Sequence, residues 1–225
     1  QVFNYSNLFF VWGERMEVIN KNDIKQGTVI DLTHEGHGVV KFDRYPIFVP
    51  NALINEDIEF KVIKVKKNFA IGKLMNVLKE SENRVEPPCK YYWKCGGCQL
   101  QHMTYEAQLA MKKEQVVNLF HRKAQFNDTV INDTVGMDNP WSYRNKSQLP
   151  IGKDKDNTAI MGYYRHRSHD IIDMDSCLIQ DEQHQEIMNQ IKQWLNELKV
   201  SIYNEKTKKG LLRHLVIRTG HYTDE

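Results

Sequence analysis

Short runs of apolar and β-branched residues, separated by polar turns, fill the first third of the chain after residue 22. This spacing predicts strands, because a strand needs only about four to eight residues and the turns carry Gly, Asn and Asp. We predict five strands, at residues 27–33, 38–42, 45–50, 57–65 and 69–77. Five short strands in so few residues favour a small closed barrel over a sandwich, which usually has about seven strands.

The character of the sequence changes near residues 81–88, where a polar stretch ends in two prolines and predicts a linker. We therefore expect residues 22–80 to form a barrel of the oligonucleotide-binding (OB) type and residues 81–225 to form a second, central domain. Residues 1–21 are predicted to be a leader, either of non-native origin or disordered, with Met16 as a candidate natural start.

Beyond the linker, apolar residues at helical spacing predict two helices, at about 104–123 and 181–198, with Thr104 as the N-cap of the first. Strands are predicted between and after them, at 142–151, 159–164, 170–174 and 211–219. The expected fold class is mainly β with α+β: a five-stranded OB-like barrel, followed by a mixed antiparallel-sheet central region with flanking helices.

Composition narrows the class of protein. Apolar residues make up 40% and charged residues 27% of the 225 positions, as in soluble globular proteins. The apolar stretch around Phe9–Trp12 lacks a basic start and a small-residue cleavage site, which argues against a secretory signal. No run of about 18 apolar residues occurs, so we expect a cytoplasmic protein without a membrane partner.

Four cysteines are the candidate metal ligands: Cys89, Cys95, Cys98 and Cys177. Cys95 and Cys98 flank two glycines, which is typical of a metal-binding knuckle. Four thiolates can hold a [4Fe–4S] cluster or a structural zinc ion, and the spacing alone does not decide between them. Four ordinary buried thiols are the third interpretation. A radical enzyme is disfavoured, because the cluster of such an enzyme has three cysteine ligands and keeps one iron free for the cofactor, whereas this chain offers a fourth cysteine.

Two basic stretches are candidate RNA-binding surfaces. The stretch between Ile58 and Leu78 contains one glutamate and five lysines, namely Lys61, Lys64, Lys66, Lys67 and Lys73. They could contact phosphates or simply form a solvated face. A second set interleaves aromatic and basic residues: Tyr143, Arg144, Lys146, Tyr163, Arg165 and Arg167. Such residues can stack on unpaired bases and neutralise phosphates, or they can protect an edge strand and fill a core.

The cysteine pattern, with Gln-x-Gln-His102 after Cys98 and Cys177 far downstream, resembles the iron–sulfur signature of bacterial 23S ribosomal RNA (uracil-5-)-methyltransferases. The barrel resembles the TRAM domain with which many of those enzymes begin. Further similar stretches are Pro140–Lys146, Met161–Tyr163 leading into Asp170–Cys177, and Leu212–His214.

The resemblance implies that all four cysteines bind a [4Fe–4S] cluster. It also implies that the intact protein binds ribosomal RNA, flips out a uridine, and methylates its carbon 5 with S-adenosylmethionine, through attack of a cysteine on carbon 6. A monomer is expected. The helix at 104–123 would pack on the methyltransferase domain.

Family members continue with a Rossmann-like catalytic domain. This sequence has no glycine-rich loop after a strand and no fifth cysteine. We therefore expect that domain to be absent, the chain to be inert alone, and none of its residues to be catalytic. Two other functions stay open: a non-enzymatic RNA-binding module with a zinc site, and a ferredoxin-like electron carrier.

Overall fold

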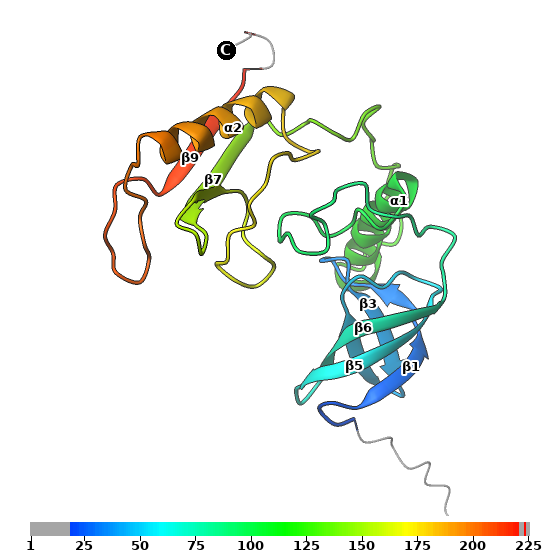
Figure 1. The fold of residues 1–225 in the computed structure, drawn as a ribbon. Helices are drawn as coiled ribbons and strands as arrows, with labels where there is room; N and C mark the ends of the chain where they lie inside the picture. Colours follow the sequence, from blue (N-terminus) through cyan, green and yellow to red (C-terminus); the bar gives the residue numbers. More distant parts are fainter. Residues whose placement is uncertain (1–18, 221–222, 224–225) are drawn as a thin grey trace, which may run out of the picture. The chain divides into compact units, whose positions relative to one another are not determined.

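The computed structural model describes residues 19–220 and 223, and the expected leader therefore lies almost entirely outside the described residues (Figure 1). The chain divides into two compact units. The first comprises the residues up to Thr33 together with His37–Ser81, and the second comprises His34–Gly36 and the residues from Glu82 onward. Within the described ranges, no helix combines the length and apolar character needed to cross a membrane.

A six-stranded sheet forms the first unit. Its strands are β1 (Ile24–Thr28), β2 (Asp31–Leu32), β3 (Gly38–Phe42), β4 (Tyr45–Val49), β5 (Asp57–Val65) and β6 (Ala70–Lys79). The order across the sheet is β1-β5-β6-β4-β3-β2. Neighbouring strands are antiparallel except β4 and β6, which run parallel.

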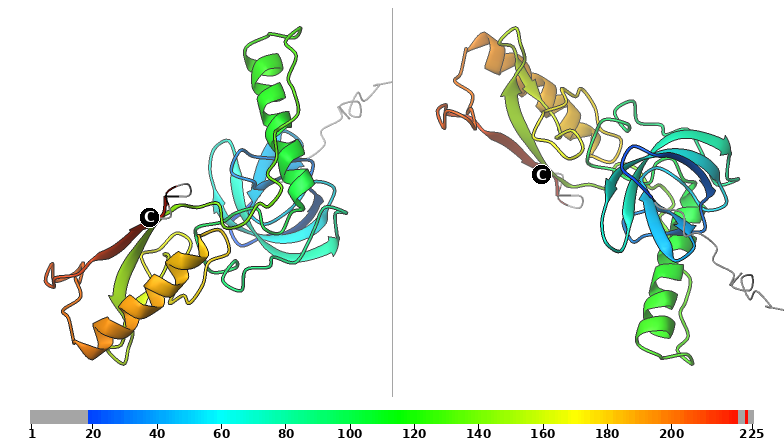
Figure 2. Two further views of the ribbon diagram at one scale, coloured as in Figure 1. Left: turned by 90° about the horizontal axis from the view of Figure 1, so that it is seen from above. Right: turned by 90° about the horizontal axis from the view of Figure 1, so that it is seen from below.

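The expected first strand at 27–33 is wrong in its bounds, because it starts earlier and breaks at Val29 and Ile30. The two halves, β1 and β2, stand at opposite ends of the strand order. The bent stretch from β1 to β2 therefore forms both edge strands, pairing with β5 through β1 and with β3 through β2. At the bend the Ile30 amide donates to the Val39 carbonyl at 2.9 Å, and the sheet curls on itself (Figure 2). A Cβ at Gly27 would lie 2.6 Å from a Val40 methyl carbon, so β1 passes β3 where only glycine fits. The break gives six strands where five were expected.

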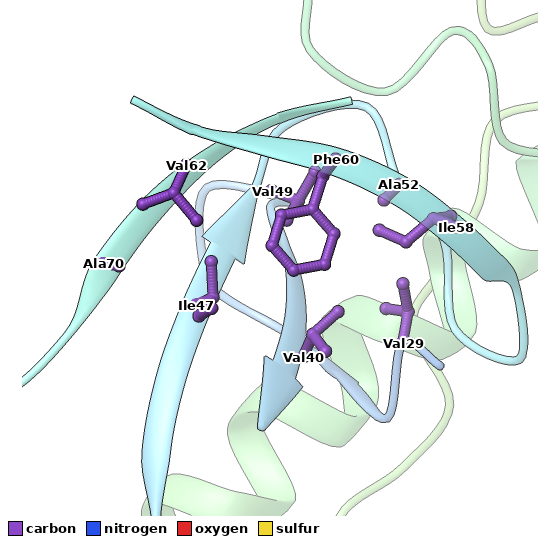
Figure 3. Close-up of a cluster of buried hydrophobic side chains, with 9 residues drawn as sticks. All are labelled: Val29, Val40, Ile47, Val49, Ala52, Ile58, Phe60, Val62 and Ala70. Carbon is purple, nitrogen blue, oxygen red and sulfur yellow. The ribbon is translucent and has the colours of Figure 1, made fainter. Parts of the chain in front are cut away.

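Nine buried side chains fill the interior of this sheet (Figure 3): Val29, Val40, Ile47, Val49, Ala52, Ile58, Phe60, Val62 and Ala70. On β5, Ile58, Phe60 and Val62 point inward because alternate residues of a strand face opposite sides. A register shift after Val62 ends this alternation, and the strand continues with three exposed residues. The exposed end of β5 carries Lys64, one of the predicted RNA contacts.

The second unit contains a smaller sheet of three antiparallel strands. They are β7 (Lys146–Lys153), β8 (Ala159–Met161) and β9 (His214–Arg218), in the order β8-β7-β9. Helix α2 (Glu182–Glu197) lies along this sheet and buries Met188 and Leu195 against it (Figure 2). Its N-cap, Asp181, accepts a hydrogen bond from the Gln183 amide at 2.9 Å.

The predicted strand at 170–174 does not form a regular strand. Ile172 and Met174 donate their amides to the carbonyls of Tyr163 and Met161, which aligns the segment with the chain after β8. A Cβ at Gly162 would lie only 2.1 Å from the Ile172 carbonyl oxygen, so the two backbones approach closely at this point. The close approach brings the stretch before Cys177 up to Tyr163.

The predicted helix at 104–123 is present as α1 (Tyr105–Asn118) continued by a π-helical turn, η1 (Leu119–Lys123). Thr104 is confirmed as its N-cap, since its hydroxyl accepts a hydrogen bond from the Ala107 amide. The loop after the helix folds back along it, where the Met137 amide donates to the Tyr105 hydroxyl at 2.8 Å.

Candidate metal centre

The first three cysteines lie on a knuckle built from tight turns. The Tyr92 amide donates to the Cys89 carbonyl, and the amides of Lys94 and Cys95 both donate to the Tyr91 carbonyl. The knuckle then pairs with the segment after β8, where the Gly96 amide donates to the Tyr164 carbonyl at 3.0 Å. A Cβ at Gly96 would lie 3.3 Å from that oxygen, which explains a glycine at this position.

Cys177 comes from a loop far along the chain from the knuckle. Its loop is tied to the knuckle by Asp175, which accepts hydrogen bonds from the Lys90 ammonium at 2.8 Å and the Tyr91 hydroxyl at 3.0 Å. Hydrogen bonds from Lys90, Ser176 and Tyr91 lower the pKa of Asp175 to about 2. These exposed contacts bring the fourth cysteine to the first three, although surface pairs of this kind contribute little stability.

All four cysteine side chains line one pocket. Burial raises the pKa of the Cys95, Cys98 and Cys177 thiols, and the neighbouring cysteine sulfurs raise it further. In the described part of the chain, no three His, Cys, Asp or Glu residues are grouped closely enough to hold a single metal ion. The site is thus a pocket to which four partly buried thiols contribute.

Hydrogen-bond donors point at these sulfurs. The Gly97 amide donates to the Cys95 sulfur at 3.3 Å. The backbone amides of Ile179 and Gln180 hydrogen-bond to Cys177 and lower its pKa, opposing the effect of burial. The Gln101 side chain has the same effect on Cys98. Such donors stabilise thiolates, the form of cysteine that binds metals.

Arg144 also lines the cysteine pocket, which the sequence did not indicate. Its guanidinium Nε donates to the Lys146 carbonyl at 3.1 Å, and its Cζ lies 5.3 Å from the centre of the Tyr163 ring. Its charge lowers the pKa of Cys95 and Cys177. The pocket therefore combines four thiols with one fixed cation.

The second predicted RNA surface is divided by the structure. Arg144 and Tyr163 line the cysteine pocket, and the Tyr163 hydroxyl accepts a hydrogen bond from the side-chain NH₂ group of Gln180 at 2.6 Å. Tyr143, Lys146, Arg165 and Arg167 are exposed. In the first unit, Lys64, Lys66 and Lys67 are exposed and Lys61 is partly so. The six residues of the second predicted RNA surface are thus divided between the cysteine pocket and the exposed surface.

His102, the last residue of the motif that follows Cys98, is fully buried. Its Nδ1 lies 2.6 Å from the Tyr92 hydroxyl, and Tyr92 also lines the cysteine pocket. The helix cap is Thr104. Sequence reasoning missed Tyr92 and Gln101 as pocket residues, although Gln101 belongs to the motif that follows Cys98.

Comparison with known proteins places these features in context. A scan of protein-family models gave no match. The chain is 74% identical over 210 residues to an uncharacterized RNA methyltransferase of Staphylococcus epidermidis and 71% identical to one of Staphylococcus aureus. Each match covers 93% of this chain and 46% of the relative, so the chain spans about half the length of these relatives.

A solved structure matches as well. The Pyrococcus abyssi tRNA (uracil-54, C5)-methyltransferase, in complex with S-adenosyl-L-homocysteine, is 29% identical with a TM-score of 0.66. The match covers 89% of this chain and 44% of the solved one.

These matches correct the expectation that a Rossmann-like catalytic domain is absent and that the chain is inert. That expectation is contradicted, because most of the chain matches a uracil methyltransferase and its relatives are about twice as long. The lack of a glycine-rich loop and of a fifth cysteine is a property of these 225 residues alone. The homologues of this chain are named RNA methyltransferases, and its structure matches that of a tRNA uracil-C5 methyltransferase.

Proposed function

We propose that the chain is the RNA-binding and cluster-bearing part of an S-adenosylmethionine-dependent methyltransferase that makes 5-methyluridine in 23S ribosomal RNA. The observation that carries the proposal is the convergence of four cysteines, from two segments far apart in sequence, on one pocket. It is supported by the 74% identity to a protein named an RNA methyltransferase. The S-adenosyl-L-homocysteine bound to the solved relative supports S-adenosylmethionine as methyl donor.

We propose a [4Fe–4S] cluster as the occupant of the cysteine pocket, with Cys89, Cys95, Cys98 and Cys177 as ligands. Two thiolates on one zinc ion lie less than about 4.6 Å apart, because each Zn–S bond is about 2.3 Å. A cluster spreads its thiolates more widely, since each one binds a different iron. Among the described residues no three of these thiols are grouped to hold a single metal ion, which favours the wider arrangement. Amide groups also donate hydrogen bonds to three of the four thiols. When bound, the cluster would brace the knuckle against the Cys177 loop.

The lysines of the first unit are the proposed phosphate contacts. Lys61 on β5 stands directly opposite Lys73 on β6. Like charges in directly opposed positions destabilise a sheet, so this pair favours a surface that meets anions. Glu59 is bonded to Gln26 and Asn76 instead of a lysine. A basic stripe of Lys61, Lys64, Lys66, Lys67 and Lys73 would bind an RNA backbone with little sequence preference.

Release of tritium from RNA labelled with [5-³H]uridine tests the proposed activity. Methylation replaces the hydrogen on carbon 5, and that proton leaves to water. The full-length protein, incubated with S-adenosylmethionine, should release tritium from a 23S ribosomal RNA transcript and none when the methyl donor is omitted. Release from tRNA transcripts alone would contradict the ribosomal substrate, and release from neither RNA would contradict the activity.

A further inference from the structure

We propose that a cleft beside the cysteine pocket binds one unpaired nucleobase that carries an exocyclic amino group. This inference rests on RNA binding as the proposed function. The cleft has a volume of about 800 Å³ and lies wholly within the second unit. It is lined by residues of the knuckle from Gly97 to Gln101, of the start of α1, and of the segment that contains Pro140, Trp141 and Tyr143.

The backbone directs Tyr143 into this cleft. Ser142, with a positive φ of 53°, and Arg144 donate their amides to the carbonyls of Leu178 and Ile179, at 2.9 and 2.8 Å. Arg144 also pairs with Gln180 in a parallel bridge, so the backbone is extended from Tyr143 onward. Side chains alternate along an extended segment. Arg144 therefore lines the cysteine pocket while Tyr143 lines the cleft, where it is 55% exposed. An exposed ring held on a fixed backbone is a surface for stacking a base.

Hydrogen bonds also fix the part of the lining that α1 contributes. Gln108 on α1 donates its side-chain amide to the carbonyls of Leu100 and Met103, at 3.1 and 2.9 Å. Tyr105 holds the returning loop through the Met137 amide. The cleft is therefore bounded by side chains and backbone that are already ordered, which lowers the entropy cost of binding a flat ring.

The polar groups of the cleft select the ligand. Gln99 and Gln108 use their NH₂ groups on backbone carbonyls, which leaves their oxygens as acceptors. Glu86 and Glu106 add negative charge to the lining, against one cation, Lys112, among the lining residues. This balance disfavours a phosphate. A base with an amino group can stack on Tyr143 and donate to the acceptors.

The test compares a short oligouridine with the same strand carrying one central adenosine, by fluorescence anisotropy on the chain purified without air. The wild type should bind the adenosine strand more tightly. Tyr143→Ala should weaken that binding by about 5- to 150-fold, since one stacked base contributes about that much, and should remove the adenosine preference. Tyr143→Phe should behave like the wild type. Trp194→Ala, which removes another exposed aromatic ring of the same unit, is the matched control and should change nothing.

The outcomes separate this inference from the function on which it rests. If the wild type binds neither strand at low salt, RNA binding itself is contradicted and the inference falls with it. If the wild type binds both strands equally, and Tyr143→Ala binds as the wild type does, the inference is overturned while RNA binding stands. A loss confined to the adenosine strand supports it.

Discussion

Cys177→Ser should reduce both the iron content and the melting temperature of the second unit. Cys177 follows Cys98 by 79 positions, so its bond to a cluster closes a long loop. By analogy with cross-link entropy, losing that bond should cost about 2–4 kcal/mol. In a chain of this size the loss corresponds to roughly 5–15 °C in melting temperature. Differential scanning calorimetry and iron analysis on the same preparation measure the two effects.

The contacts of Asp175 with Lys90 and Tyr91 remain in this variant, but they are exposed and contribute little stability. They should not replace the cluster bond. Ser176→Ala is the matched control, because it alters the neighbouring residue without removing a sulfur, and it should retain iron and melt close to the wild type. An unchanged melting curve at full iron loading would show that Cys177 is not a ligand.

Lys64→Ala/Lys66→Ala should flatten the dependence of RNA affinity on salt. Removing one lysine from a phosphate lowers the slope of log affinity against log salt by about 0.7 on single strands, so the double variant should lower it by about 1.4. The reason is that each neutralised phosphate releases bound counterions. Fluorescence anisotropy with a single-stranded ribosomal RNA segment over a series of salt concentrations measures the slope.

A second lysine pair tests whether position or total charge matters. Lys206 and Lys208 are exposed in the second unit, before β9. Lys206→Ala/Lys208→Ala removes the same charge and should leave the slope unchanged. Identical slopes for the wild type and the Lys64/Lys66 variant would mean that the basic stripe is only a solvated face.

Local sequence signals predicted the elements with the strongest periodicity or caps. Thr104 and the apolar spacing after it located α1, and the run of apolar and β-branched residues at 57–65 located β5. These features depend on neighbours a few residues away. The break between β1 and β2 was not predictable in the same way, because it arises from closing the sheet and from the tight passage of Gly27 past Val40.

The candidate site shows the same limit. The spacing of Cys95 and Cys98 indicated a knuckle, but the different surroundings of Tyr143 and Arg144 depend on pairing with residues 178–180, far along the chain. Composition alone placed both residues on one RNA surface. The expectation of an absent catalytic domain was wrong for another reason. It rested on two motifs that these 225 residues lack, a glycine-rich loop and a fifth cysteine, and such a lack does not describe the protein as a whole.

The iron and acid-labile sulfide content of protein purified without air tests the central proposal most directly. Four thiols around one pocket predict a brown protein with about four irons and four sulfides per chain. Stoichiometric zinc without acid-labile sulfide, in protein kept from air throughout, would contradict the cluster.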